Sequence, residues 1–431
     1  MSKKLLLPGI LLFSSLLSTA QHINKIIDST EVKRIEKILS SDEFQGRKIS
    51  TPGIDKAAEF IASEFKKNKL AFWGDLHTYK QDFSILKTIL TSTTAYFDSK
   101  KIDSNSVIAI TTQPDISITE KSDYHLARIS GKNDLLKEAV TYIEDNKNYL
   151  VIVDTSHAKS FNKINRFKKE DITKNSNVIF ILSPRIPLSY RVEINHSITQ
   201  TKLTNIIGVI PGKNKKDEYV IFSGHYDHLG VGKPNNNADS IFNGANDDAA
   251  GITAVITLSK YFNTVKDNER TLVFIAFTAE ETGGFGSKYF SSQINADKVV
   301  AMFNIEMIGT ESKWGHNSAY ITGYEKSDFG KILQKNLRNT AFNFKPDPYP
   351  SQYLFYRSDN AALAALGVPA HTISTSKMDN EIYYHTAEDE IETLDIKNMT
   401  AIIKAIAISS QTIVNAKDTP TRIENTSNID Q

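Results

Sequence analysis

The chain has 431 residues, which is long enough for one large domain or two. Its formal net charge is only +1, so composition gives no electrostatic reason to expect nucleic acid or an acidic surface as a partner. The sequence contains no cysteine, which excludes disulfides, thiolate metal ligands and a lipid anchor on an N-terminal cysteine.

Residues 1–20 have the pattern of a secretory signal peptide. Two lysines precede an apolar run over residues 5–17, and a Ser-Thr-Ala sequence suited to cleavage ends at Ala20. The apolar run is too short to span a bilayer, and a Pro-Gly pair interrupts it. We therefore expect an exported protein, periplasmic or extracellular, without an integral membrane segment after signal cleavage.

Residues 21–95 are expected to form a mainly helical part of the larger domain. Within residues 31–70 the apolar side chains follow helical spacing on both sides of a turn rich in glycine and proline. The second of these helices has apolar side chains on one face, namely Ala57, Phe60, Ile61 and Phe65. A scaffolding role is expected for this helical pair.

Residues 96–202 differ in character and are expected to form a separate, smaller αβ module of typical small-domain size. Short strands are predicted at residues 106–110, 150–153 and 178–182, with an amphipathic helix at 134–144. This stretch shows no cluster of metal-binding residue types. Three roles stay open for it: narrowing a substrate entrance, binding a partner, or only stabilising the fold.

Two candidate metal ligands follow the short apolar strand predicted at residues 220–223. His225 and Asp227 fall just beyond its carboxyl end. In open α/β sheets this edge is where ligands bind. A His-x-Asp pair suits a metal because the carboxylate can hold the imidazole in one tautomer while the other ring nitrogen coordinates.

Further acidic residues occupy equivalent positions along the chain. Asp247 and Asp248 begin an apolar-striped helix predicted at 249–262. The next two predicted strands, 271–277 and 299–305, are followed by Glu280 and Glu281 and by Glu306. Each acid alone is more often a helix cap or a solvated turn residue. Together with His225 they form an imidazole–carboxylate set of the kind that binds zinc.

The remaining elements complete the larger domain. Strands are predicted at 319–322 and 369–373, with helices at 327–337, 359–366 and 394–414. His385 lies in a polar loop after a tyrosine pair, and Tyr356 and Arg357 are candidates for the wall of a substrate pocket or for structural roles. The polar tail, 418–431, is predicted to be disordered.

The ordered segments HYDHLG, GANDDAAG, AEE, EMIG and YHTAED resemble the M28 family of zinc aminopeptidases. The match runs from residue 203 to about 394, and residues 41–65 resemble the family's usual lead-in. The resemblance implies a zinc-exopeptidase-like α/β fold, with a mixed, mainly parallel central sheet flanked by helices. It implies a catalytic domain at 203–417, with residues 96–202 inserted as a lid or protease-associated module.

The resemblance also implies a site for two zinc ions. His225 and Glu306 would hold one ion, Glu281 and His385 the other, and Asp247 would bridge both. Most family members carry Asp where this chain has Glu306, whose stem is one methylene longer. This departure puts the geometry of that ligand in doubt and leaves the class unchanged.

Three more residues receive catalytic roles from the same resemblance. Glu280 would be the general base, Asp227 would orient His225, and Tyr384 would donate to a developing oxyanion. The reaction implied is the release of N-terminal amino acids from peptides. Three alternatives stay open: a single-zinc enzyme similar to glutaminyl cyclase, a carboxypeptidase, and an inactive binding protein on the same fold.

Overall fold

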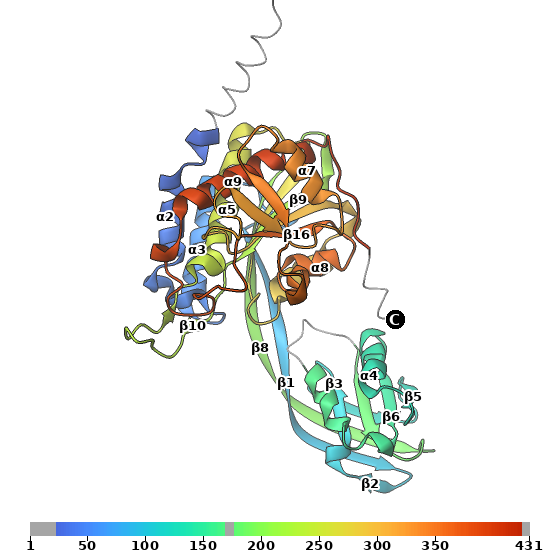
Figure 1. The fold of residues 1–431 in the computed structure, drawn as a ribbon. Helices are drawn as coiled ribbons and strands as arrows, with labels where there is room; N and C mark the ends of the chain where they lie inside the picture. Colours follow the sequence, from blue (N-terminus) through green and yellow to red (C-terminus); the bar gives the residue numbers. More distant parts are fainter. Residues whose placement is uncertain (1–22, 169–175, 425–431) are drawn as a thin grey trace, which may run out of the picture. The chain divides into compact units, whose positions relative to one another are not determined.

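The computed structural model describes residues 23–168 and 176–424 and divides the chain into two compact units (Figure 1). Unit 2 is Phe83–Lys202, and unit 1 comprises the described residues on either side of it. The predicted signal peptide, residues 1–20, lies outside the described residues. None of the described helices is long and apolar enough to cross a membrane.

Unit 1 contains most of the helices and the larger part of the sheet. Its helices are α2 (Ser29–Leu39), α3 (Pro52–Lys67), α5 (Ala250–Val265), α6 (Phe285–Gln293), α7 (Phe329–Asn336), α8 (Asn360–Ala364), α9 (Ile396–Ser409) and α10 (Gln411–Val414). Its strands are β9 (Lys215–His225), β10 (Gly230–Val231), β11 (Ile241–Phe242), β12 (Arg270–Phe277), β13 (Val299–Ile305), β14 (Ser318–Ile321), β15 (Asn343–Pro346) and β16 (Ala370–Ser374). Two long strands, β1 (Lys80–Phe97) and β8 (Tyr190–Ile210), have residues in both units.

The central sheet of unit 1 has the strand order β15-β14-β16-β13-β9-β12-β8. Strands β16, β13, β9 and β12 are parallel to one another, whereas β8 and β14 pair antiparallel with β12 and β16. The predicted fold class, a mixed and mainly parallel sheet with flanking helices, is confirmed.

The register of the parallel strands brings the predicted ligand positions to one edge. Phe277 lies opposite His225 in the β12–β9 pair, and Asn304 lies opposite Ser223 in the β13–β9 pair. All three strands therefore end at nearly the same level. The turns that follow them carry acidic and imidazole side chains toward a common space.

Alternation along the strands divides the core between two sheet faces. Phe222, Phe274 and Phe303 stack on one face, in the cluster that includes the buried sides of α2, α3, α5, α7 and α9. Ile221 and Val273 point to the other face and pack with residues of α6 and α8. Helices α2, α3, α5 and α9 gather on one side of unit 1 (Figure 1).

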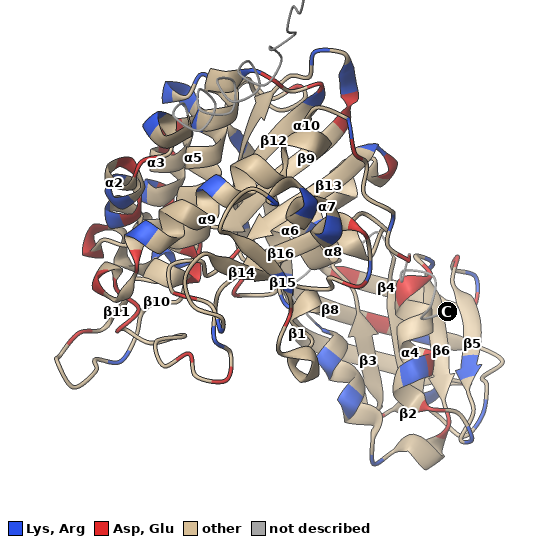
Figure 2. Cartoon of the chain, turned by 45° about the horizontal axis from the view of Figure 1, so that its top comes forward, with Lys and Arg blue, Asp and Glu red and all other residues tan. Residues whose placement is uncertain are grey.

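The helices of the first face begin and end as their sequences indicate. Asp28 caps α2 by accepting from the backbone N–H groups of Thr30 and Glu31, and α3 begins with Pro52. Basic and acidic residues are interspersed along both helices, as Figure 2 shows. These outer faces are therefore solvated surfaces without a dominant charge sign.

Unit 2 has a sheet of its own with the order β3-β7-β6-β5. Its elements are β2 (Lys100–Ile102), β3 (Val107–Ile110), β4 (Asp115–Thr119), β5 (His125–Ile129), α4 (Leu135–Glu144), β6 (Tyr149–Val153) and β7 (Val178–Leu182). Strands β5, β6 and β7 are parallel, β3 is antiparallel to β7, and α4 packs over their buried aliphatic side chains. The three strands and the helix predicted from the sequence are all present.

The structure departs from the sequence predictions at two boundaries. The compact units divide between Asp82 and Phe83, near the start of β1, whereas the predicted boundary lies between residues 95 and 96, near its end. The single helix predicted at 394–414 is divided at Ser410. The hydroxyls of Ser409 and Ser410 bond the carbonyls of the preceding turn there and compete with the helical hydrogen bonds.

The prediction that the whole tail from residue 418 is disordered is wrong for its described part, 418–424. Arg422 donates to the carbonyls of Ala296, Val299 and Leu366, and the side chain of Ile423 is buried. One cation and one apolar side chain therefore hold this segment on unit 1, although its composition is polar.

Candidate metal centre at the carboxyl edge of the sheet

His225 is the last residue of β9 and is fully buried. Its Nδ1 lies 3.0 Å from the backbone carbonyl oxygen of Asp227, and its Nε2 lies 3.1 Å from Oδ1 of Asp247. A carbonyl oxygen only accepts hydrogen bonds, so the proton belongs on Nδ1 and the lone pair on Nε2. The backbone thus presents His225 in the tautomer that a metal ligand needs.

Asp247 lies between two imidazoles, on the turn that precedes α5. Its Oδ1 faces His225, and its Oδ2 lies 3.2 Å from Nε2 of His385. The turn is held by the carboxylate of Asp389, which accepts from the backbone N–H groups of Asn246 at 2.8 Å and Asp247 at 3.0 Å. Asp247 is therefore fixed with one oxygen directed at each imidazole.

Glu281 follows β12 on a tight turn in which Ala279 has a φ of 59°. Its Oε2 lies 3.1 Å from Nε2 of His385, and its Oε1 accepts from Nδ1 of His228 at 2.8 Å. Burial lowers the pKa of His385, but the carboxylates of Asp247 and Glu281 outweigh burial and raise it to about 10. The negative charge of these two carboxylates favours a cation beside His385.

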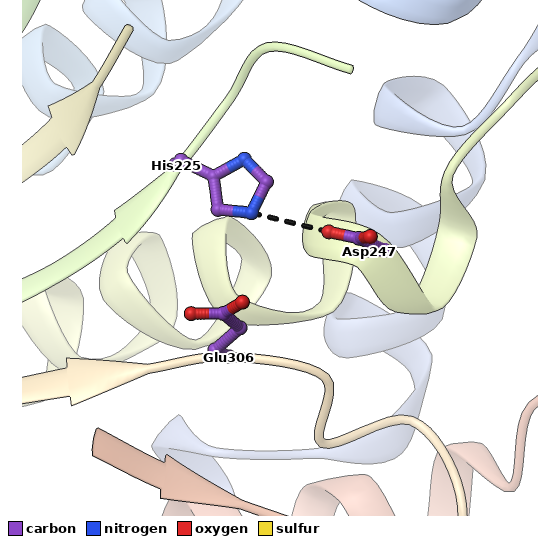
Figure 3. Close-up of side chains that lie close together, drawn as sticks. All are labelled: His225, Asp247 and Glu306. Atoms are coloured by element: carbon purple, nitrogen blue, oxygen red, sulfur yellow. Dashed lines mark ion pairs between the residues drawn. The ribbon is translucent and has the colours of Figure 1, made fainter. Parts of the chain in front are cut away.

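Glu306 follows β13 and completes a group with His225 and Asp247, whose ligand atoms all lie within 4.8 Å of one another. Figure 3 shows the three side chains pointing toward one another, with the His225–Asp247 pair marked. The Ser358 hydroxyl donates to Oε2 of Glu306. Burial raises the pKa of Glu306 to about 7. A second group joins His228, Asp247 and Glu281.

The residues present fit zinc on two observations. The Nε2 atoms of His225, His228 and His385 are buried and have no hydrogen-bond partner in the described structure, although two of them face carboxylate oxygens. In addition, no described Lys or Arg pairs with the carboxylates gathered here, which are Asp227, Asp247, Asp248, Glu280, Glu281 and Glu306. Buried imidazole nitrogens and carboxylates without a Lys or Arg partner are the donors that zinc takes.

Glu280 and Asp227 meet in the turn after β12. The Asp227 carboxylate accepts from the backbone N–H of Glu280 at 3.1 Å and of Glu281 at 3.3 Å, and it lies 3.8 Å from Nδ1 of His225. Asp227 therefore touches His225 through its carbonyl oxygen and supports the Glu280–Glu281 turn with its carboxylate. Burial raises the pKa of Glu280 well above its usual range, and its carboxyl forms no ion pair with any described residue.

Tyr384 stacks on the ring of His385, with centroids 3.9 Å apart. It also lines a small cavity of about 50 Å³ beside Glu306, together with Arg357. Burial raises the pKa of Tyr384, which keeps its hydroxyl protonated at neutral pH. Of the two candidate wall residues, Arg357 lines this cavity, whereas Tyr356 is 49% exposed and is absent from its lining.

Three contacts of the site were not predicted. His228 bonds Glu281, Asp389 holds the turn of Asp247, and Ser358 bonds Glu306. His228 and Asp389 both lie inside the quoted HYDHLG and YHTAED segments, which were the available signals. Asp248, expected as a cap or supporting residue, accepts from the backbone N–H groups of His225, Gly251 and Met307.

Comparison with known proteins identifies this region. Residues 205–409 match Peptidase family M28. This stretch is just under half of the chain, and it contains all five predicted metal ligands. A vacuolar membrane protease of Schizosaccharomyces pombe is 25% identical over 246 residues, which are 55% of this chain and 26% of that protein. A probable zinc metalloprotease of Pyricularia oryzae is 33% identical over 113 residues, which are 26% of this chain and 22% of that protein.

The predicted resemblance to family M28 is confirmed for residues 205–409. Zinc as the metal agrees with the names of these relatives, whereas the number of ions does not follow from them. The chain spans about a quarter of the length of the curated M28 relatives named above.

Solved structures share the fold. BSAP, a zinc aminopeptidase from Bacillus subtilis, superposes with a TM-score of 0.54 at 18% identity, covering 93% of this chain and 99% of that chain. The glutaminyl cyclase of Porphyromonas gingivalis superposes with a TM-score of 0.51 at 12% identity, covering 90% and 99%. This fold therefore occurs both in a protein named a zinc aminopeptidase and in one named a glutaminyl cyclase.

The predicted periplasmic or extracellular location is wrong by this comparison. Curated relatives from Schizosaccharomyces pombe and Saccharomyces cerevisiae are named vacuolar membrane proteases, which contradicts that location. A short apolar N-terminal segment indicates entry into a secretory route, but it carries no information on the final compartment. The pattern of residues 1–20 is therefore not sufficient to predict an exported protein.

Proposed function

We propose that this chain is a zinc-dependent aminopeptidase whose site holds two zinc ions. The observation that carries the proposal is the position of Asp247. Its two carboxylate oxygens face two different imidazole nitrogens, at 3.1 Å from His225 and 3.2 Å from His385. A carboxylate directed in this way suits a bridge between two cations, whose mutual repulsion it offsets.

The ligands divide into two sets on either side of this bridge. His225 and Glu306 would hold one ion, and Glu281 and His385 the other. His228 adds a third imidazole on the Glu281 side, where its Nδ1–H holds one oxygen of that carboxylate. The Ser358 hydroxyl plays the matching part for Glu306, so each acidic ligand has a neighbouring donor that orients it.

When bound, zinc supplies Lewis-acid polarisation of the peptide carbonyl and acidifies the attacking water. Glu280 would take the proton from that water and deliver it to the leaving amine, because its carboxyl is half-buried and forms no ion pair with a described residue. The protonated hydroxyl of Tyr384 would donate to the negative charge that develops on the carbonyl oxygen. The carboxylate of Asp227 would keep Glu280 in place through their backbone contact.

The electrostatics of the site favour an N-terminal substrate. The six carboxylates and the absence of a paired Lys or Arg in the described structure make the site attractive to a protonated α-amino group. The small cavity beside Glu306 would accept the first side chain of the peptide. Arg357 at this cavity is the one feature that favours the alternative of a carboxypeptidase.

Aminoacyl-arylamides and short peptides test the proposal, each with a free and with an acetylated N-terminus. We expect release of N-terminal residues from the free substrates only, loss of that activity with a chelator, and recovery with zinc. Cleavage that depends on a free C-terminus would instead support the carboxypeptidase. Cyclisation of glutaminyl peptides with release of ammonia would support the single-zinc cyclase.

A further inference from the structure

Arg47 lies at the end of an unusual turn that precedes α3. Gln45, Gly46 and Arg47 all have positive φ, at 48°, 66° and 49°. Two of them carry side chains, and such residues stay in this conformation only where the surroundings hold them there. Gly46 is required, because a Cβ would come within 2.5 Å of the carbonyl oxygens of Gly230 and Phe242.

The side chain of Arg47 is only 1% exposed and donates to backbone carbonyls alone. Nε donates to Tyr226 at 2.9 Å and Nη2 to Gly244 at 2.9 Å. Nη1 donates to Leu39 at 2.7 Å and to Asn243 at 2.5 Å. Three of these four hydrogen bonds join Arg47 to residues 179 to 197 positions away, as the several donors of one guanidinium allow.

Three of these carbonyls, those of Tyr226, Asn243 and Gly244, belong to the two segments that carry the central ligands. Tyr226 stands between His225 and Asp227, and Gly244 begins the turn that leads to Asp247. The backbone oxygen of Arg47 also accepts from the N–H of His228 at 3.2 Å. Arg47 therefore ties the exit of β9 to the Asp247 turn.

Burial of the charged Arg47 guanidinium costs desolvation free energy, which a residue that only fills space would not require. In the described structure it forms no ion pair, and burial lowers its pKa, opposed by the charges of Glu36, Asp389, Asp247 and Asp248. An apolar side chain would fill the same space without this penalty. The guanidinium gains from the acidic site itself, whose negative charge it partly balances.

We propose that Arg47 is a positioning residue of the metal centre, which holds the exit of β9 and the Asp247 turn at the separation that the ligands need before metal binds. This inference rests on the proposed metal site. It also replaces the scaffolding role expected for the segment around residues 31–70 with a direct link to the site.

The experiment compares Arg47→Lys with Arg270→Lys in the full chain. Arg270 serves as the control, since it is equally buried in unit 1 and donates to the carbonyls of Ile413 and Asp418; it also pairs with Glu218 at 2.6 Å. It lies at the start of β12, at the opposite end of the strand from Glu280. Lysine keeps the charge at both positions and removes the fork.

Zinc affinity is measured by competition with a chromophoric chelator, beside thermal stability. We expect Arg47→Lys to weaken the binding of at least one ion by roughly 10- to 100-fold, as for other residues that orient metal ligands. Arg270→Lys should lose comparable thermal stability while zinc affinity stays within about twofold. Equal zinc affinities in the two variants would overturn the proposal, whereas a wild type that binds no zinc would overturn the proposed function instead.

Hydrogen exchange on the metal-free wild type gives a second test that needs no variant to fold. If Arg47 organises the site in advance, the amides of His228, Asn246 and Asp247 should remain protected without metal. Exchange of these amides at the rate of an exposed loop, with protection appearing only on zinc addition, would show that the metal and not Arg47 orders the segment.

Discussion

The acidic residues that follow parallel strands have different environments in the two units. In unit 2, Asp154 follows β6, caps the next turn through the N–H of Ser156 at 3.0 Å, and pairs with Arg128 at 2.8 Å. In unit 1, Glu306 follows β13 at the same topological position, is half-buried, and pairs with no described cation. An acid at a strand end is thus a turn cap in one unit and a candidate ligand in the other.

The two units also differ in the polar side chains that they bury. Among the described residues of unit 2, the buried side chains that can titrate are His196 and Tyr190, and the other buried polar residues are threonines and serines. Unit 1 buries several carboxylates and imidazoles at one sheet edge. Because an unpaired buried charge is costly, such a cluster persists only where something compensates it, and a bound dication does so.

The largest expected effect comes from Glu280→Gln. The change keeps the shape of the side chain and removes its basicity, so kcat should fall about 10²- to 10⁴-fold while zinc content stays unchanged. Steady-state kinetics and elemental analysis on one sample measure both quantities. Asp154→Asn is the matched control in unit 2 and should leave kcat unchanged; a similar loss there would break the contrast between the units.

The second effect concerns the apolar core of unit 2. Phe180 is fully buried on β7, and Phe180→Ala should destabilise unit 2 by about 3–5 kcal/mol through the lost burial and the cavity that remains. Thermal unfolding should show an earlier transition while zinc content is retained. Phe274→Ala is the equivalent truncation in the core of unit 1. This variant should lose zinc when unit 1 unfolds.

A smaller effect is expected at His371, a buried histidine of unit 1 that is not among the proposed metal ligands. His371 is buried on β16, with Nδ1 2.8 Å from the carbonyl of Thr322 and Nε2 2.7 Å from the hydroxyl of Ser327. Burial lowers its pKa to about 4, so the folded state keeps it neutral while the unfolded chain takes up a proton near pH 6.5. Stability from this group is therefore complete above about pH 6.5 and is lost as the pH falls toward 4.

Urea unfolding at pH 7.5 and pH 5 measures this term. Relative to His371→Gln, the wild type should lose roughly 2 kcal/mol of unfolding free energy between the two values. Zinc affinity at pH 7.5 should be the same in both proteins, because both ring nitrogens of His371 already have partners. A pH-independent difference would mean that His371 titrates normally in the folded state.

The strands and the acidic positions that follow them could be predicted because both are local properties. Apolar runs located β12 and β13, and the residues just after them, Glu280, Glu281 and Glu306, could be read directly from the chain. The long strands β1 and β8 were missed, since many of their side chains are exposed and polar and show no continuous apolar pattern.

The supports of the site could not be predicted, because each joins distant segments. Asp389 meets the N–H of Asp247 across 142 residues, Arg47 meets Tyr226 across 179, and Ser358 meets Glu306 across 52. No spacing rule relates such pairs. Asp227 illustrates the same limit, since its sequence position suggested a bond from its carboxylate to His225, whereas the turn directs that carboxylate to Glu280 and Glu281.

Zinc stoichiometry of the purified full-length chain tests the central claim most directly. Elemental analysis after equilibration in zinc-buffered solution should give two ions per chain, and Glu306→Ala should retain one, because the Asp247, Glu281 and His385 set is untouched. One ion in a fully active wild type, or two ions held at wild-type affinity by Glu306→Ala, would contradict the assignment of Asp247 as a bridge between two metals.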